Sequence, residues 1–232
     1  MKQLTRRRGL SLLLSLLLLL SLLPTAAFAA DTKNTIYTDM NYKGVSDGTE
    51  NKPYANFEDA IANASDGDTI VIKGKAYANV KEEAGTTPLI IDKRVTVTGA
   101  GGAVGELYVR AGGIFLGADV TMRNVELNLA NKYHNAIFVN GYRFTAENVT
   151  RGSGSREVHL FAGGIGTNTQ VTAQMPVPGN NAVLTLTNCT FGSIYAGGVA
   201  DGFAGDVTVT ATGSAGTAST VLRVRYAECN AG

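Results

Sequence analysis

Five short segments of the chain place a threonine between two apolar residues, and all five keep the same register. They begin at Val95, Val120, Phe144, Leu184 and Val207. Successive segments start 25, 24, 40 and 23 residues apart, so one period near 24 fits them if the 40-residue step carries an inserted loop. Apolar and polar residues that alternate at period two predict a strand with one buried face. A strand that recurs once per roughly 20 to 30 residues cannot bury this face alone, so we expect the copies to stack in parallel sheets.

Asparagine occupies the fifth position in three of these segments, as Asn124, Asn148 and Asn188. We expect each threonine to lie on the outer face of the sheet, beside the threonines of neighbouring copies, and each asparagine to lie at a corner where the chain bends. Stacked asparagine side chains form hydrogen bonds along such a corner, and asparagine tolerates the unusual backbone angles that a corner requires. The pattern therefore predicts an all-β repeat fold.

A second near-repeat has a different composition. Phe161-Ala162-Gly163-Gly164 and Tyr195-Ala196-Gly197-Gly198 lie 34 residues apart. Their similarity predicts equivalent strands in neighbouring copies, with a tight corner at the glycine pairs.

The segment 36–72, which precedes the repeats, reads as strand, turn, helix and strand. Asn56 is expected to cap a short helix, and Ser65-Asp66-Gly67 is expected to end it. The apolar residues of this helix fall on one side: Phe57, Ala60, Ile61 and Ala64. A short amphipathic helix at this place would cover the open end of the apolar core, which stacked repeats require.

The same segment contains Asp47-Gly48-Thr49, Lys52-Pro53-Tyr54 and Gly67-Asp68-Thr69-Ile70. In this order it resembles the N-terminal part of secreted right-handed parallel β-helix proteins of the pectin-lyase-like superfamily, among them adhesin-like bacterial surface proteins. The resemblance continues through Leu89-Ile90-Ile91 and Val95–Gly99 and extends to about Ala211. It implies a right-handed single-stranded parallel β-helix with a short N-terminal capping α-helix, and it is poorly specific for any activity.

The N-terminal residues carry the features of a signal peptide. Basic residues Lys2 and Arg6 to Arg8 precede an apolar run of 14 residues, Leu10–Leu23, and the small residues Ala27 and Ala29 follow. This run is short for a bilayer span, and the small residues suit cleavage after Ala29. A retained membrane anchor is the alternative. We expect a secreted, extracellular or cell-surface protein with no membrane span after cleavage.

Removal of residues 1–29 takes away four basic residues and no acidic ones, which leaves 16 basic against 19 acidic residues and a net charge of −3. No basic stripe survives cleavage, so nucleic acid is not an expected partner. The two cysteines are too few for a disulfide framework. Cys189 follows the corner residue Asn188, so we expect it to be a small buried apolar side chain.

The sequence does not assign catalytic residues. Under the resemblance, a lyase needs calcium-binding carboxylates with an Arg or Lys base, and a hydrolase needs two or three close carboxylates. Beyond the N-terminal segment the acidic residues are instead scattered singly: Asp92, Glu106, Asp119, Glu126, Glu147, Glu157, Asp201 and Asp206. His134 and His159, the only histidines, do not form a zinc set with the single acidic neighbour Glu157.

One loop resembles a calcium-binding template only in part. Oxygen-bearing residues and a glycine fall at positions 1, 3, 6, 9 and 12 of the template: Asp39, Asn41, Gly44, Asp47 and Glu50. Lys43 at position 5 would repel the ion, and flanking helices are missing. Calcium is therefore possible but unsupported, and no cofactor is expected.

The candidate ligand site consists of polar and aromatic residues on neighbouring copies. If the corners at Asn124 and Asn148 align, then Asn131, Tyr133, His134 and Tyr142, together with Lys132, lie close together. Aromatic faces beside hydrogen-bonding groups suit sugar rings, which present both apolar patches and hydroxyls. The alternative is that these residues simply lie on a loop and bind no ligand.

The leading hypothesis is a non-catalytic module, adhesin-like or glycan-binding, whose partner is an extracellular polysaccharide or a host or cell-surface glycan. The alternatives are a polysaccharide lyase or another carbohydrate-active enzyme of this fold, and a rigid spacer.

We expect a signal peptide at 1–29, the first strand, capping helix and first coil at 30–74, and further coils at 75–212. Residues 213–232 are expected to form an irregular end without a cap, as in a truncated or frame-shifted piece of a longer protein. The alternative is a natural, mildly disordered terminus.

Overall fold

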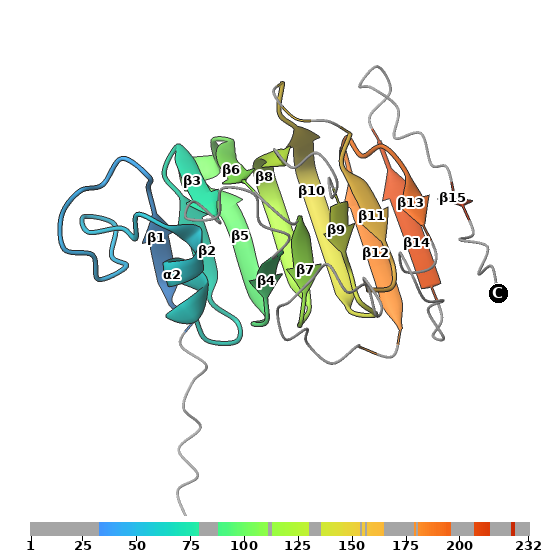
Figure 1. Cartoon of the computed structure of the whole chain (residues 1–232), viewed down its shortest axis with the longest axis horizontal. Coiled ribbons are helices and arrows are strands. Elements are labelled where there is room, and N and C mark those ends of the chain that lie inside the picture. Colours follow the sequence, from blue (N-terminus) through green and yellow to red (C-terminus); the bar gives the residue numbers. More distant parts are fainter. Residues whose placement is uncertain are drawn as a thin grey trace, which may run out of the picture. The chain divides into compact units, whose positions relative to one another are not determined.

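The computed structural model describes residues 33–78, 88–110, 113–129, 136–153, 155, 157–164, 179, 181–195, 207–213 and 224–225. All the elements below belong to the unit Asn34–Gly232. This unit is built from parallel strands in two sheets, together with one short α-helix and one 3₁₀ turn within the described residues (Figure 1). The predicted all-β class with parallel sheets is confirmed. The predicted signal peptide lies outside the described residues.

The larger sheet has nine strands. Its main path follows the sequence order of seven strands: β1 (Thr35–Thr38), β2 (Thr69–Ile72), β5 (Val95–Gly99), β8 (Val120–Leu129), β10 (Arg143–Arg151), β12 (Ala182–Thr187) and β14 (Val207–Thr212). Two further strands, β3 (Lys75–Ala78) and β6 (Gly105–Val109), pair with each other, and β6 pairs with the second half of β8.

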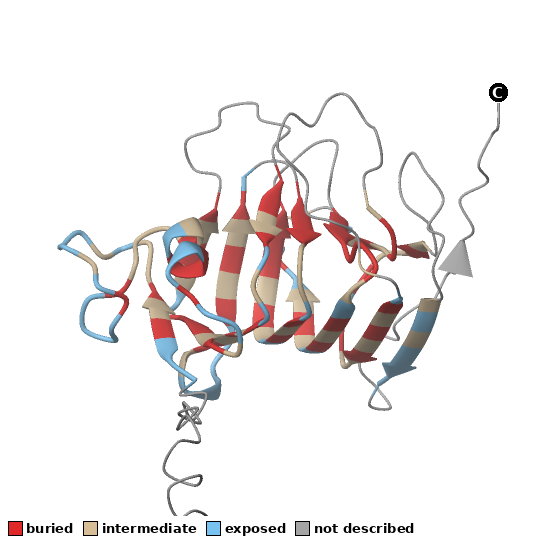
Figure 2. Ribbon diagram, turned by 90° about the horizontal axis from the view of Figure 1, so that it is seen from below, coloured by how far each residue is buried: buried red, intermediate tan, exposed pale blue. Residues whose placement is uncertain are grey.

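The smaller sheet has six parallel strands. They are β4 (Leu89–Ile91), β7 (Ile114–Leu116), β9 (Ala136–Phe138), β11 (His159–Phe161), β13 (Ile194–Tyr195) and β15 (Val224–Arg225). From β7 onward, consecutive strands alternate between the two sheets. The inward side chains of both sheets form one apolar cluster, and buried and partly buried residues alternate along most strands of the larger sheet (Figure 2).

The predicted register of the repeated segments is confirmed at three of the four steps. Val95 pairs with Val120, Val120 with Phe144, and Phe144 with Leu184. At the last step the prediction was wrong, because Leu184 pairs with Val209 and not with Val207. A shift of two residues keeps every side chain on the same face, so alternation alone could not distinguish the two registers.

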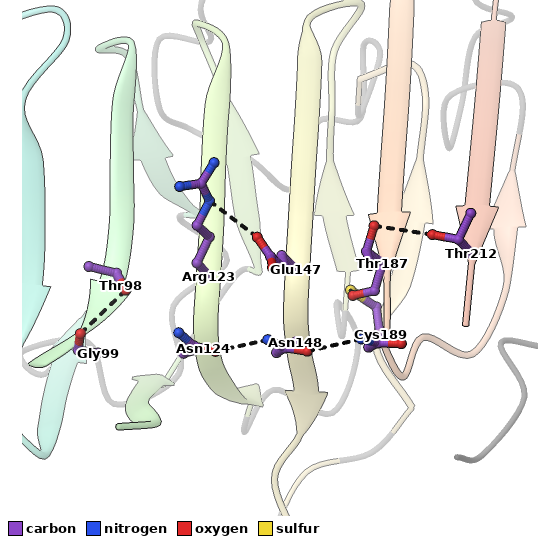
Figure 3. Close-up of polar contacts among 10 residues, drawn as sticks. Thr98, Gly99, Arg123, Asn124, Glu147, Asn148, Thr187, Cys189 and Thr212 are labelled. Carbon is purple, nitrogen blue, oxygen red and sulfur yellow. Dashed lines mark hydrogen bonds and ion pairs between the residues drawn. The ribbon is translucent and has the colours of Figure 1, made fainter. Parts of the chain in front are cut away.

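The predicted asparagine corner is confirmed. Asn124, Asn148 and Asn188 have φ values of 50°, 52° and 52°, in the left-handed region that asparagine tolerates better than most residues. The side-chain amide nitrogen of Asn148 donates to Oδ1 of Asn124 at 3.0 Å (Figure 3). The side-chain amide nitrogen of Asn188 donates to Oδ1 of Asn148 at 3.3 Å. The three side chains therefore bond strand to strand, from positions within β8 and β10 to the residue directly after β12.

One column of the outer face consists of threonine alone from β1 to β14. The paired residues are Thr35, Thr69, Thr96, Thr121, Thr145, Thr185 and Thr210. The next column is mixed and includes an ion pair between Arg123 and Glu147 at 3.5 Å (Figure 3). Threonine favours strands and pairs well across them, so the column stabilises the stack.

The helix α2 (Phe57–Ala62) begins where the sequence predicted it. Phe57, Ala60 and Ile61 are buried, as expected for its apolar side. The predicted capping bond was wrong: the side chain of Asn56 does not bond the helix backbone but donates to Oδ2 of Asp59 at 3.2 Å. No helix among the described residues has the length and apolar character needed to cross a bilayer.

Strands β3 and β6 were not predicted. The segment Ala76–Ala78 lies in β3. The strand β6 follows β5 after only one tight turn, η1 (Ala100–Gly102). This turn requires Gly99, because a Cβ atom at that position would lie 1.9 Å from the carbonyl oxygen of Ala103. The turn places β6 beside β3 and β8, on the flank that carries the site described next.

Candidate functional site

Three of the four residues proposed to bind glycans, Asn131, Tyr133 and His134, lie outside the described residues. The fourth, Tyr142, is partly buried and packs against the main apolar cluster. Its amide donates to the carbonyl of Val139 at 3.1 Å, in a turn between β9 and β10. The proposed grouping around Tyr142 therefore stays a prediction.

The carboxylates of the calcium-like loop are engaged in turns. Oδ1 of Asp39 accepts from the amide of Asn41 at 2.9 Å. Oδ1 of Asp47 accepts from the hydroxyl and amide of Thr49, at 2.6 and 3.0 Å, and these bonds hold the pKa of Asp47 below its usual value. Within the described ranges, no three His, Cys, Asp or Glu side chains come together as a metal site.

The strands β3, β6 and β8 lie side by side (Figure 1), and their outer face carries a compact polar and aromatic group. Strand pairing aligns it in two rows of three residues. One row is Lys75, Glu106 and Glu126, and the other is Tyr77, Tyr108 and Asn128. We call these six residues the β3–β6–β8 cluster. Their side chains point outward because the residues between them, Ala76, Leu107 and Leu127, belong to the buried core.

The charged groups of the cluster converge on two short contacts. Nζ of Lys75 lies 2.6 Å from Oε1 of Glu106, and the two side chains are 30% and 27% exposed. The hydrogen bond with Glu106 raises the pKa of Lys75 above its usual value. Nδ2 of Asn128 donates to Oε1 of both Glu106 and Glu126, at 2.6 and 3.2 Å. One amide group thus holds two carboxylates.

The two tyrosines form a paired aromatic surface beside these charges. The ring centroids of Tyr77 and Tyr108 are 5.0 Å apart, and their planes are tilted by 52°. The ammonium of Lys75 lies 5.2 Å from each ring centroid. This is the distance range of a cation–π contact, so the rings and Glu106 together surround one ammonium group.

Asn128 is the buried member of the cluster, with 8% of its surface exposed. Its Oδ1 atom is buried and accepts no hydrogen bond from the described residues, although Nδ2 of the same amide is fully used. Gly152 packs directly on this amide, where a Cβ atom would lie 2.1 Å from Oδ1. The amide is therefore held rigidly, and the buried acceptor without a partner is costly unless the site has a use for it.

The smaller sheet carries a column of aromatic rings on its outer face. Phe115, Phe138, Phe161 and Tyr195 pair strand to strand, with ring centroids 6.0, 5.2 and 4.5 Å apart. The first two rings are buried, and the last two are partly buried. The pairing of Phe161 with Tyr195 confirms that the near-repeat marks equivalent strands.

His159 borders this column and is fixed by the backbone. Its Nδ1 accepts from the amide of Ser193 at 3.1 Å, and its ring meets that of Tyr195 edge to face at 6.0 Å. Since the rings of the column stack on one another, their faces are used internally, and the column is best explained as packing.

The sequence reading that acidic residues are scattered singly was wrong for Glu106 and Glu126, which lie opposite each other on adjacent strands. They are 20 residues apart, a spacing that differs from the main period because β6 is an additional strand. A signal was present: Lys75-Ala76-Tyr77, Glu106-Leu107-Tyr108 and Glu126-Leu127-Asn128 share the order charged, apolar, hydrogen-bonding.

Comparison with known proteins does not extend these observations. No protein-family model, curated protein or solved structure matches the chain.

Proposed function

We propose that the chain is a right-handed single-stranded parallel β-helix that is exported from the cell and acts outside it or on its surface. Alternation of the strands between two parallel sheets supports this fold, as does the asparagine stack at one corner. The signal-peptide pattern of residues 1–29 supports export.

Within this fold, the chain is a non-catalytic, adhesin-like module that binds an extracellular polysaccharide or a cell-surface glycan at the β3–β6–β8 cluster. The observation that carries the proposal is the half-buried tyrosine pair, Tyr77 and Tyr108, beside the hydrogen-bonding groups of Glu106 and Glu126. Apolar faces of sugar rings stack on aromatic rings, and sugar hydroxyls bond to carboxylates and amides.

A glycan array with the exported chain tests this proposal. We expect binding to one or more glycans, and we expect Tyr108→Ala to weaken it roughly tenfold, because an aromatic contact contributes up to about 1.5 kcal/mol beyond its buried area. Tyr42→Ala, which removes a tyrosine from the 39–50 loop, is the matched control and should bind like the wild type. A blank array, or equal binding by Tyr108→Ala, would sink the proposal.

A carbohydrate-active enzyme is the second candidate, and one observation favours it. Oε1 of Glu106 and Oε1 of Glu126 both contact Nδ2 of Asn128, so they are no further apart than the sum of 2.6 and 3.2 Å. Two carboxyl groups about 5 Å apart are the arrangement of retaining glycosidases. The ion pair of Lys75 with Glu106 argues against this role, because the ammonium occupies that carboxylate.

Two assays separate the enzyme from the binding module. Release of reducing ends from neutral oligosaccharides, abolished by Glu106→Gln, would establish a hydrolase. Elimination from uronate polymers gives an unsaturated product that absorbs ultraviolet light, so flat absorbance across several uronates with added calcium would remove the lyase. The binding module predicts neither signal.

A further inference from the structure

The β3–β6–β8 cluster has an excess of negative charge at Glu126. One ammonium, that of Lys75, faces two carboxylates, and it pairs with Glu106. Among the described residues, no cation lies within ion-pair distance of Glu126, whose Oε1 accepts only from the amide of Asn128 at 3.2 Å. A carboxylate that is partly desolvated and held in place by an amide is preorganised to form an ion pair with a cation.

The contacts of Lys75 show that an ammonium group fits the surroundings of this cluster. Lys75 already places an ammonium against a carboxylate and between two tyrosine rings, 2.6 Å from Glu106 and 5.2 Å from each centroid. Glu126 repeats the position of Glu106 one strand along, about 4.8 Å away. Tyr108 lies diagonally next to it, in the row that ends at Asn128.

Asn128 provides an independent indication of a ligand. Its side chain is more than nine-tenths buried within the cluster, yet no donor in the described part of the chain bonds to Oδ1. A buried acceptor of this kind costs roughly 1 to 3 kcal/mol of stability when it stays unpaired. A hydroxyl or ammonium donor on a bound ligand would remove this cost.

We propose that the β3–β6–β8 cluster selects glycans that carry free amino groups, with the ammonium of an amino sugar on Glu126 and the sugar ring against Tyr108. This inference rests on the proposed function of the same site and names its ligand class. Uronate polymers are disfavoured, because their carboxylates would meet Glu106 and Glu126. Neutral sugars lack the charge that would pair with Glu126.

Calorimetric titration with three hexasaccharides tests the inference. A β-1,4-linked glucosamine hexamer and a glucose hexamer of the same linkage differ in one substituent per ring, and a uronate hexamer carries the opposite charge. We expect the glucosamine hexamer to bind about fivefold or more tightly than the glucose hexamer, the range of a partly exposed ion pair. Glu126→Gln should remove this preference, and Glu157→Gln, the same change beside the smaller sheet, should leave it intact.

Salt dependence of the wild type gives a test that needs no variant. The preference for glucosamine should shrink when ionic strength rises from about 50 mM to about 500 mM, because salt screens the ion pair. If the glucose or uronate hexamer binds as tightly as the glucosamine hexamer, the amino-sugar inference is wrong while glycan binding stands. Failure of all three hexamers and of the glycan array to bind overturns the proposed function and the inference together.

Discussion

At the residue scale, the asparagine stack combines two different requirements in one side chain. Asn148 is its middle member: it donates to Asn124 at 3.0 Å, accepts from Asn188 at 3.3 Å and has a φ of 52°. The backbone conformation alone would suit glycine, and the hydrogen bonds alone would suit several polar residues. Asparagine is among the few residues that satisfy both.

Substitution of Asn148 separates these requirements. We expect Asn148→Ala to lower the free energy of unfolding by about 2 kcal/mol, because it loses the side-chain bonds and strains the left-handed backbone. Asn148→Gly should cost about 1 kcal/mol, since only the bonds are lost. Urea denaturation followed by circular dichroism measures both values. Equal losses in the two variants would show that the backbone conformation does not matter.

Lys75 gives the site a pH-dependent contribution to stability. Its pKa is raised above 10.5 in the folded chain, mainly by the bond to Glu106. A raised pKa of a base means that the stabilisation is complete below the unfolded pKa and is lost as pH rises through the folded pKa. We therefore expect Lys75→Met to cost about 1 kcal/mol at pH 8, a value kept small by solvent screening, and less above pH 10.5.

The control for this experiment is Lys93→Met, which lies outside the cluster. The difference between wild type and Lys93→Met should not change over the same pH range. A constant difference for Lys75→Met across pH 8 to about 12 would contradict an ionic origin of the stabilisation.

At the element scale, the main strands and the short helix could be predicted because their signals are local. Alternation marked β5, β8, β10, β12 and β14, and the apolar side of α2 marked the helix. The strands β3 and β6 could not be found in this way, because they break the period and each follows a turn that contains glycine. The cluster is built on these two strands, so the strand period did not predict it. Which residues lie beside Glu126 depends on which strands pair with β8.

The pairing of β12 with β14 is testable because the two candidate registers place different residues side by side. In the structure Thr185 pairs with Thr210, whereas the sequence period would pair it with Thr208. Neighbouring residues in register lie about 4.8 Å apart, within the Cα range of a disulfide, while a shift of two residues along the strand exceeds about 7 Å.

Cysteine pairs therefore distinguish the registers. In a background of Cys189→Ala and Cys229→Ala, we expect Thr185→Cys with Thr210→Cys to oxidise to a disulfide under mild conditions. The pair Thr185→Cys with Thr208→Cys should stay reduced. Mass spectrometry after peptide digestion reads both results, and the reverse pattern would favour the register predicted from the sequence.

At the scale of the whole molecule, one apolar cluster joins both sheets and α2. Cys189 belongs to this cluster, and burial raises the pKa of its thiol. A thiol that is both covered and protonated reacts slowly, because the thiolate is the reactive form. The rate at which a thiol reagent labels Cys189 therefore measures how often the apolar core around it opens.

In a Cys229→Ala variant, we expect Cys189 to react with a thiol reagent at pH 8 at least about a hundredfold more slowly than in urea. The labelling rate should follow the free energy of unfolding as urea is added, because the residue lies in the common core. Rapid labelling in the absence of urea would show that β12 and its neighbours open independently of the rest.

The threonine column has a consequence for how such a chain can change in length. Its members, from Thr35 to Thr210, each pair in register with the threonine of the adjacent strand. Duplication of one period would therefore add a strand whose threonine pairs with a threonine on each side, so the sheet would need no new kind of interface. A gene encoding this fold can grow or shrink by whole periods, while the flank that holds β3 and β6 keeps its chemistry unchanged.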